Sequence, residues 1–185
     1  MGPAAVDHPE PWSEEQYFAL PYTGQRHELI DGVLMMSPAP NLRHQRISQR
    51  LWQILDLAIP VGHEVHGPIN VRLAPDRVVI PDVAVLTNAG GDGLVVPAAE
   101  VLVMVEVVSP STRRIDRVLK PSLAAEAGIP YYILVEPDDP TVIVHELVDD
   151  AYRAVTSASG AERLSVTDPF PMDFRPAELL ASRRA

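Results

Sequence analysis

Two acidic residues interrupt the most hydrophobic stretches of the sequence. Asp82 stands in VVIPDVAVL, which runs from Val78 to Leu86, and Glu106 stands in VMVEVVSPST, residues 103–112. Each stretch otherwise has the valine, isoleucine and leucine content of a buried strand. A carboxylate in a dry core is costly unless it is paired, hydrogen-bonded or bound to a cation. The two acids are therefore candidate functional residues.

One divalent cation bound by both carboxylates would offset their charge and their mutual repulsion. Oxygen ligands favour Mg²⁺ or Mn²⁺, and such an ion activates water for attack on a phosphodiester. Glu28, in HELIDG, is available as a third oxygen ligand. A nearby lysine would orient or deprotonate the water and stabilise the developing charge. These residue types indicate metal-assisted hydrolysis.

Two other arrangements would leave these acids without a cation. Protonation of one acid removes its charge. Alternation along a strand also allows either side chain to point to solvent, or to accept backbone hydrogen bonds at a strand end. Pro81, directly before Asp82, is typical of an edge strand or a bulge. The residues alone leave these alternatives open.

The elements before Asp82 begin with a short helix and a hairpin. Ser13 is of the residue type that caps a helix N-terminus, and Pro21 ends this helix. The stretch RHELIDGVLMMSPAP predicts two strands joined at Asp31-Gly32, a dipeptide typical of two-residue hairpin turns. Glu28 lies on the first arm of this hairpin.

A long helix follows through NLRHQRISQRLWQILDLAI, with Asn41 as its predicted N-cap. His44 precedes Ile47 by about one turn and so lies toward the buried side. The apolar residues recur at helical spacing, at Ile47, Leu51, Ile54 and Ala58. Another face carries a basic stripe, formed by Arg43, Arg46 and Arg50 together with Gln53.

Strands dominate the chain after Gly62, with one more helix between Ser109 and Gly128. Gly128 is predicted to take the position just after the end of this helix. Pro121 either interrupts the helix or begins it. Because the helix joins two apolar strands, it predicts a βαβ crossover within a mixed sheet. The stretches TVIVHELV and AYRAVTS predict a hairpin.

Size and composition exclude several classes of protein. At 185 residues we expect one domain over residues 13–185, after a flexible proline-rich tail at residues 1–12. The absence of cysteine excludes disulfides, thiolate metal sites and a catalytic thiol, and it favours a cytoplasmic location. No apolar run approaches the roughly 18 residues of a membrane span, and no signal-peptide pattern is present. The net charge of −10 argues against a nonspecific polyanion binder, so any contact with nucleic acid must be local.

Five stretches occur in an order that resembles a known family. They are HELIDGVLMMSPAP, LRHQRISQRL, VIPDVAVL, VEVVSPSTRRIDRVLKP and AEAGIPYYILVEPDD. This set resembles the Uma-type family of restriction-endonuclease-like proteins, within the PD-(D/E)XK nuclease superfamily. The resemblance implies an α/β (α+β) fold, with a restriction-endonuclease-like core in which helices flank a central mixed sheet. It also implies a site that uses Mg²⁺ or Mn²⁺, and a homodimer.

The resemblance assigns roles by motif position. It implies that Glu28, Asp82 and Glu106 are metal ligands. The superfamily pattern places a lysine two residues after the second acid, but Val108 occupies that position in this chain. Lys120, in the following helical stretch, matches the lysine of the family and is the predicted fourth catalytic residue.

Three neighbouring positions bear on this assignment. Asp116 lies four residues before Lys120, so on an unbroken helix the two side chains would pair with each other. Ala124 stands where the family commonly has a tyrosine. His44 matches a histidine of the family motif, which leaves two interpretations, a core histidine or a supporting residue at the site.

These observations lead to competing hypotheses about function. The first is a metal-dependent endonuclease that hydrolyses phosphodiester bonds of DNA through Glu28, Asp82, Glu106 and Lys120. An alternative is a catalytically inactive nuclease-fold module for binding or assembly, and a third is a purely structural homo-oligomer. In the first hypothesis arginines meet phosphates, because their forked donors match phosphate oxygens. The candidates are Arg43, Arg46, Arg50, Arg113, Arg114 and Arg117.

Overall fold

The computed structural model describes residues 4–6, 10–21, 24–88, 91 and 93–181. Over these residues the strands form two six-stranded sheets and one two-stranded sheet. The N-terminal sheet has the strand order β1 (Ala4–Ala5), β3 (Val33–Ser37), β2 (Arg26–Ile30), β6 (Arg77–Val79), β5 (Asn70–Ala74) and β8 (Val95–Pro97). The central sheet has the order β12 (Ala151–Ser159), β11 (Thr141–Val148), β10 (Tyr131–Glu136), β9 (Val101–Val107), β7 (Val83–Leu86) and β4 (Glu64–His66). The small sheet pairs β13 (Leu164–Val166) with β14 (Met172–Phe174).

The first two helices begin at the predicted caps. The side chain of Ser13 accepts a hydrogen bond from the backbone of Gln16 at the start of α1, and Asn41 does the same for His44 at the start of α2. Gly128 has a φ of 76° just after the last α-helix, as predicted for its end. The helices are α1 (Glu14–Phe18), α2 (Leu42–Ala58) and α3 (Lys120–Glu126), with a π-helical turn at Ile115–Leu119 and 3₁₀ turns at Ala98–Glu100 and Pro176–Leu180.

The predicted hairpin forms between β2 and β3. Asp31 and Gly32 both have positive φ, at 50° and 76°, as a two-residue turn between right-twisted strands requires. Ile30 faces Val33 across the turn, which fixes the register of the whole pair. Glu28 therefore lies in the middle of β2, in the N-terminal sheet.

The apolar stretch around Asp82 does not form one strand, and this prediction was wrong. Its first part, β6, pairs with β2 and β5 in the N-terminal sheet, whereas its second part, β7, pairs with β4 and β9 in the central sheet. Pro81 lies at the break, where its missing N–H and fixed φ prevent a continuous ladder. The chain thus passes from one sheet to the other at Asp82.

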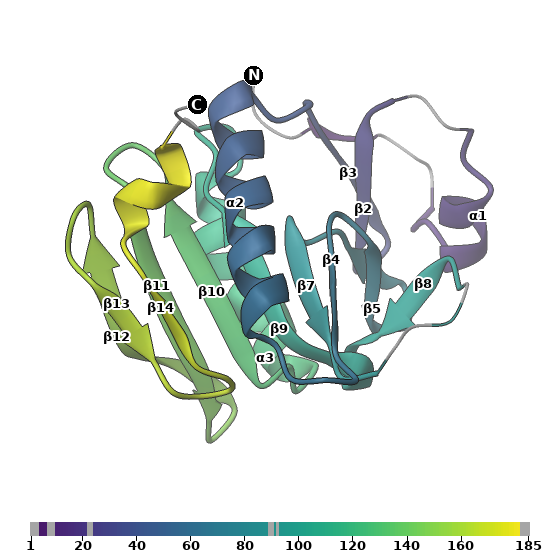
Figure 1. Ribbon diagram of the computed structural model, residues 1–185. Coiled ribbons are helices and arrows are strands. Elements are labelled where there is room, and N and C mark those ends of the chain that lie inside the picture. Colours follow the sequence, from purple (N-terminus) through teal and green to yellow (C-terminus); the bar gives the residue numbers. More distant parts are fainter. Residues whose placement is uncertain (1–3, 7–9, 22–23, 89–90, 92, 182–185) are drawn as a thin grey trace.

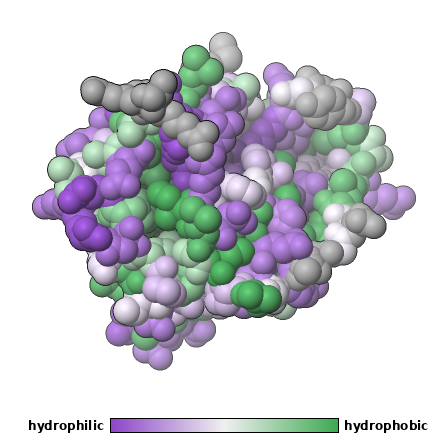
Figure 2. All heavy atoms as spheres, viewed as in Figure 1, coloured by the Kyte–Doolittle hydropathy of each residue, from purple (hydrophilic) through white to green (hydrophobic). Residues whose placement is uncertain are grey.

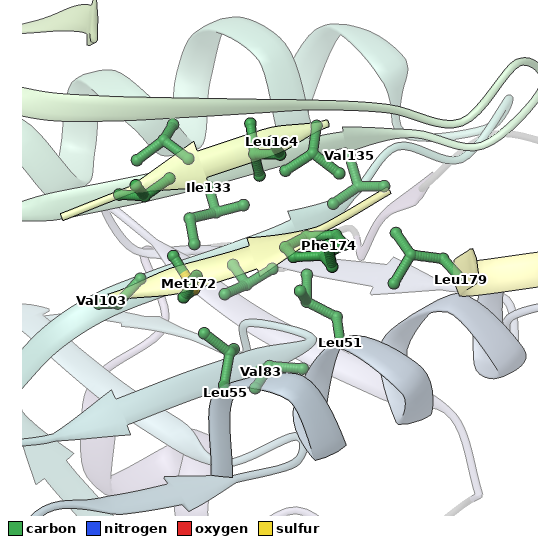
Figure 3. Close-up of a cluster of buried hydrophobic side chains, with 14 of the residues drawn as sticks. Leu51, Leu55, Val83, Val103, Ile133, Val135, Leu164, Met172, Phe174 and Leu179 are labelled. Carbon is green, nitrogen blue, oxygen red and sulfur yellow. The ribbon is translucent and has the colours of Figure 1, made fainter. Parts of the chain in front are cut away.

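The central sheet is mixed, and helices cover both of its faces (Figure 1). The strands β9 and β10 are parallel and are joined through α3, which confirms the predicted crossover, and the remaining pairs are antiparallel. One face packs against α2 in a core that also includes the small sheet (Figure 3). The other face packs against α3 and the N-terminal sheet.

Alternation along β9 assigns Glu106 to one of these two faces. Val105 and Val107 belong to the core beneath α2, whereas Met104 and Val108 belong to the core that includes α3. Because side chains alternate between faces of a strand, Glu106 points toward α3 and the N-terminal sheet. The carboxylate is therefore directed into the space between the two large sheets.

Part of the predicted tail at residues 1–12 is placed by the structure. Ala4 and Ala5 pair with Met36 and Met35 of β3. Residues 1–3 and 7–9 of the predicted tail lie outside the described residues. In the part of the chain that the structure describes, no helix has the length and hydrophobicity to cross a membrane.

Candidate active site

The four residues predicted as catalytic line one pocket of about 180 Å³. Glu28 comes from β2, Asp82 from the crossing between β6 and β7, Glu106 from β9 and Lys120 from the first residue of α3. All four are between 2 % and 4 % exposed. The pocket therefore lies where the two large sheets meet the N-terminal end of α3.

Lys120 joins two of the acids. Its Nζ lies 2.8 Å from Oε1 of Glu28 and 2.8 Å from Oε1 of Glu106. The backbone N–H of Ile80 donates a further hydrogen bond of 2.7 Å to Oε1 of Glu28. Lys120, predicted on a separate helix, thus contacts one acid from the N-terminal sheet and one from the central sheet.

The helix that carries Lys120 is widened rather than broken. Residues 115–119 form a π-helical turn, and the N–H of Lys120 donates to the carbonyl of Ile115, five residues back. Pro121 has no N–H, so the next bond of this pattern, which would end on the carbonyl of Asp116, cannot form. The hydroxyl of Tyr132 donates to that carbonyl instead, at 3.1 Å. Both interpretations of Pro121 are partly correct, because Pro121 lies in the first turn of α3 and also removes one hydrogen bond of the helix. Lys120, however, is the first residue of α3 and not its cap.

Asp116 does not form the ion pair with Lys120 that an unbroken helix would favour. Its carboxylate accepts hydrogen bonds from the hydroxyl of Thr112 and, at 3.3 Å, from the N–H of Ser109. The π-turn includes Asp116 and ends directly before Lys120, and its wider pitch changes the relative direction of the two side chains. Lys120 therefore forms its ion pairs with Glu28 and Glu106.

Asp82 is held by groups from three elements. Its Oδ1 accepts from Nη1 of Arg26 at 2.8 Å, and its Oδ2 accepts from Nε2 of His44 at 3.0 Å. The N–H of Val107 also donates to Oδ2, at 2.8 Å, and the N–H of Asp82 itself donates to the carbonyl of Val105. These two backbone bonds fix Asp82 beside the part of β9 that carries Glu106.

The buried acids outnumber the permanent cations around them. Four buried carboxyl groups line the pocket, and the permanent cations that form ion pairs with them, among the described residues, are Arg26 and Lys120. The four acids are Glu28, Asp82, Glu106 and Asp116. The pocket therefore retains an excess of negative charge that a further cation would offset.

The pKa values of the acids move in different directions because their partners differ. Burial alone would raise the pKa of both Glu28 and Asp82, but Lys120 lowers that of Glu28, and the hydrogen bond from His44 with the charge of Arg26 lowers that of Asp82. Burial raises the pKa of Glu106 well above its ordinary value, although Lys120 opposes the shift. One ammonium only partly offsets two buried carboxylates, so Glu106 is the acid of the pair that binds a proton more readily.

A model of a known protein family matches nearly the whole chain. The family model Uma2, described as "Putative restriction endonuclease", matches residues 14–181. The chain belongs to the Uma2 family. This confirms the predicted family, and all four predicted catalytic residues of the Uma2 chain lie within the matched range.

A solved structure shows the fold of this Uma2 chain in another protein. It is described as the crystal structure of "a putative nuclease belonging to DUF820 from Anabaena variabilis ATCC 29413". The two chains are 17% identical, with a TM-score of 0.68 over 86% of this chain and 90% of that chain. The predicted restriction-endonuclease-like fold is confirmed. No curated protein matches the Uma2 chain.

The donor atoms of the site suit a hard divalent cation, although they are not arranged as a finished coordination shell. Carboxylate oxygens are the ligands that Mg²⁺ and Mn²⁺ prefer. Among the described residues, no group of three or more His, Asp or Glu side chains is placed to hold a metal ion. Lys120, Arg26 and His44 instead contact the acids. An incoming metal ion would therefore have to displace some of these side chains from the carboxylate oxygens.

The arginines predicted to meet phosphates do not gather at one place. Arg43 lines the acid pocket and donates to the carbonyl of Asp138 at 2.7 Å. Arg46 is exposed on the same helix and lines a neighbouring hollow with Arg43. The other predicted arginines lie outside the lining of the acid pocket. They are Arg50, Arg113, Arg114 and Arg117, and the last of these pairs with Glu136 at 2.6 Å.

Sequence reasoning missed Arg26 and Tyr132. Arg26 precedes Glu28 by two residues on β2, so the alternation of a strand would have placed the two side chains on one face. The role of Tyr132 carries no comparable signal, because it depends on a π-turn that brings a carbonyl to a distant strand. His44, predicted as a core or a supporting residue, is both buried and bonded to Asp82.

Proposed function

We propose that this Uma2 chain is a metal-dependent endonuclease that hydrolyses phosphodiester bonds of DNA. The observation that carries the proposal is the convergence of Glu28, Glu106 and Lys120, from three elements, in one buried pocket beside Asp82. Burying this much charge is unfavourable for folding alone. Groups of this kind in a cleft are typical of catalytic sites.

We assign the metal to the acids at the junction of the two sheets. Glu28, Asp82 and Glu106 would hold Mg²⁺ or Mn²⁺, and their combined negative charge fits a divalent cation. When bound, such an ion activates water and stabilises charge on the phosphate. The backbone N–H groups of Ile80 and Val107 hold the carboxylates of Glu28 and Asp82 in place for this task.

Lys120 acts in this proposal through its charge. Burial alone would lower the pKa of Lys120, but the carboxylates of Glu106 and Glu28 raise it above its ordinary value. An ammonium held in this way is a poor acceptor of a proton from water. We therefore assign to Lys120 the orientation of the water and the stabilisation of negative charge that develops on the phosphate.

A second candidate function follows from the same contacts. The acids in this structure are already paired with Lys120, Arg26 and His44. A chain in which these pairs persist would be a nuclease-fold module that binds or assembles without cleaving. Metal-dependent cleavage separates the two candidates.

Cleavage of plasmid and single-stranded DNA with Mn²⁺ tests the proposal. The wild type should cleave, whereas Glu106→Gln and Lys120→Met should lose activity by at least about 100-fold, as removal of an electrostatic catalytic group does. A matched control is Glu126→Gln, an exposed carboxylate that pairs with Arg77. Equal activity in all four proteins would contradict the assigned site, and a lack of cleavage by the wild type would favour the binding module.

The proposal extends to the setting of the protein. We propose one domain over residues 13–185 and a cytoplasmic location. We also propose a homodimer, because restriction-endonuclease-like chains commonly act in pairs on double-stranded DNA. Light scattering of the purified protein should give twice the mass of one chain, which is 20.2 kDa. RNA offered in the same cleavage assay tests the preference for DNA.

A further inference from the structure

Arg26 uses only part of its guanidinium in this structure. Its Nη1 donates to Oδ1 of Asp82 at 2.8 Å. Its Nε and Nη2 are buried, and neither has a hydrogen-bond partner among the described residues. Buried N–H donors on a charged group are rarely left without an acceptor, and each such group needs an explanation.

The two unpartnered nitrogens form one edge of the guanidinium. The N–H bonds of Nε and Nη2 are parallel, so this edge matches a pair of oxygens on one anion. Arg72 shows how the edge is used elsewhere in this chain, because its Nε and Nη2 both donate to the carboxylate of Glu14. No anion of this kind contacts the corresponding edge of Arg26 within the described part of the chain.

Arg26 lies on the wall between the acid pocket and a larger cleft. This second cleft, which we call the α2 cleft, has a volume of about 810 Å³. The residues that line both spaces are Arg26, Pro40, His44 and Asp82. A chain of nucleotides that extends along the α2 cleft would therefore pass Arg26 as it reaches the acids.

The ligand that suits this edge is an anion with two oxygens on one centre. The acid pocket has an excess of negative charge, so a phosphodiester needs a cationic group of the chain to hold it there. We propose that Arg26 binds the phosphodiester to be cleaved, through Nε and Nη2 and two non-bridging phosphate oxygens, while Nη1 remains on Asp82. This inference rests on the proposed function, because the acids define where cleavage occurs.

The surroundings of Arg26 must shift for this contact to form. The two nitrogens are covered in the structure, and the side chain as a whole is 19% exposed. A small opening toward the α2 cleft would expose the edge without breaking the bond between Nη1 and Asp82. Arg26 would then contact both the phosphate and Asp82, a predicted metal ligand, and so hold the two at a fixed separation.

Replacing Arg26 by lysine tests the paired donors Nε and Nη2 separately from the positive charge of the side chain. Arg26→Lys keeps the positive charge but has no pair of parallel donors. Binding of a fluorescent single-stranded oligonucleotide in Ca²⁺ should weaken by about tenfold or more, which corresponds to one lost charge-assisted hydrogen bond. Arg72→Lys is the matched control, because the edge of Arg72 already holds Glu14, and its affinity should equal that of the wild type. Equal affinity of Arg26→Lys and the wild type would overturn the inference.

A second measurement needs no substitution. In wild-type protein labelled with ¹⁵N, the Nε–H signal of Arg26 should shift on addition of an unmodified dinucleotide in Ca²⁺, because its phosphodiester keeps both non-bridging oxygens. Inorganic phosphate, added in a parallel titration, distinguishes a nucleic-acid site from a site for free anion: a shift with the dinucleotide supports the inference. No shift with the dinucleotide, or a shift with inorganic phosphate alone, overturns it.

The outcomes also separate this inference from the proposed function. Metal-dependent cleavage by the wild type, combined with unchanged binding and cleavage in Arg26→Lys, would remove the role of Arg26 and leave the nuclease proposal intact. Weakened binding in Arg26→Lys without cleavage by any protein would support the phosphate site on a binding module and contradict the nuclease.

Discussion

Lys120 shares one positive charge between two buried carboxylates. Its ammonium lies at hydrogen-bond distance from both Glu28 and Glu106, which come from different sheets. Of these two acids, Glu28 also accepts a backbone hydrogen bond, from Ile80. Burial raises both pKa values, but Lys120 and Arg26, with the Ile80 bond, lower that of Glu28 below its ordinary value. The nearby charges of Asp82 and Asp116 help burial to keep the pKa of Glu106 raised.

The raised pKa of Glu106 predicts a specific pH dependence of stability. Above its ordinary pKa of 4.5 the unfolded chain has lost this proton while the folded protein retains it, so the contribution of Glu106 to the free energy of unfolding falls as the pH rises, until the native pKa is reached. Glu106→Gln removes this loss and keeps an acceptor for Lys120. Urea unfolding at about pH 5 and about pH 8 should therefore show the variant gaining stability relative to wild type at the higher pH. A difference that is independent of pH would show that Glu106 is ionised in the folded protein.

Removal of the shared cation should be strongly destabilising. Lys120→Met leaves two carboxyl groups facing each other without a counter-charge, at a cost of about 3 kcal/mol in the free energy of unfolding near neutral pH. This cost should decrease as the pH falls, because protonation of the acids removes their repulsion. Urea unfolding at two pH values measures both effects. A cost that does not change between them would contradict the predicted repulsion.

The π-turn is the element that brings Lys120 to the acids. The sequence predicted a helix and the crossover that it makes, because apolar periodicity and Gly128 are local signals. It did not predict the widened turn, because that depends on Tyr132, on a different strand, which supplies the donor that Pro121 lacks. A mutation cycle on these two residues tests the explanation.

Tyr132→Phe should cost about 1–3 kcal/mol in the free energy of unfolding, because it leaves the carbonyl of Asp116 buried without a donor. In a Pro121→Ala background the cost should be smaller, because residue 121 then has an N–H of its own for that carbonyl. Chemical unfolding of the wild type, both single variants and the double variant gives the coupling energy. Equal costs in the two backgrounds would show that Pro121 and the Tyr132 hydroxyl act independently.

The other failure of sequence reasoning also lies at the level of elements. The apolar stretch around Asp82 has the composition of one strand, and only Pro81 marks the place where it passes between sheets. Residue type and motif order predicted Glu28, Asp82, Glu106 and Lys120 as site residues, and the structure brings these four into one pocket. Strand alternation places Arg26 on the same face as Glu28, but its contact with Asp82 could not be predicted, because that contact forms only once the two sheets are joined.

The whole molecule is acidic, and this limits where nucleic acid can bind. With a net charge of −10, long-range attraction to DNA is weak, so local cations must carry the contact. Most of the surface seen in Figure 2 is hydrophilic, with hydrophobic side chains gathered near its centre. Among the arginines predicted to meet phosphates, Arg43 lines the acid pocket.

A pair of alanine variants tests this view of the surface. Arg43→Ala should weaken DNA binding and reduce the slope of log K against log salt by about one, as the loss of one phosphate contact does. Arg113→Ala, an exposed arginine outside the pocket lining, should leave both quantities close to wild type. Fluorescence anisotropy over a range of salt concentrations measures both. Larger losses in Arg113→Ala would place the DNA near the start of the π-helical turn that precedes α3 instead.

Binding of Mn²⁺ by isothermal calorimetry, with wild type compared with Asp82→Asn and Glu106→Gln, tests the central claim most directly. The wild type should bind one ion per chain and release protons as it does so, because the metal displaces the proton of Glu106. Both variants should lose at least about tenfold in affinity, and Glu106→Gln should release fewer protons. Equal binding in the three proteins, or no binding by the wild type at millimolar Mn²⁺, would contradict a metal site formed by these buried acids.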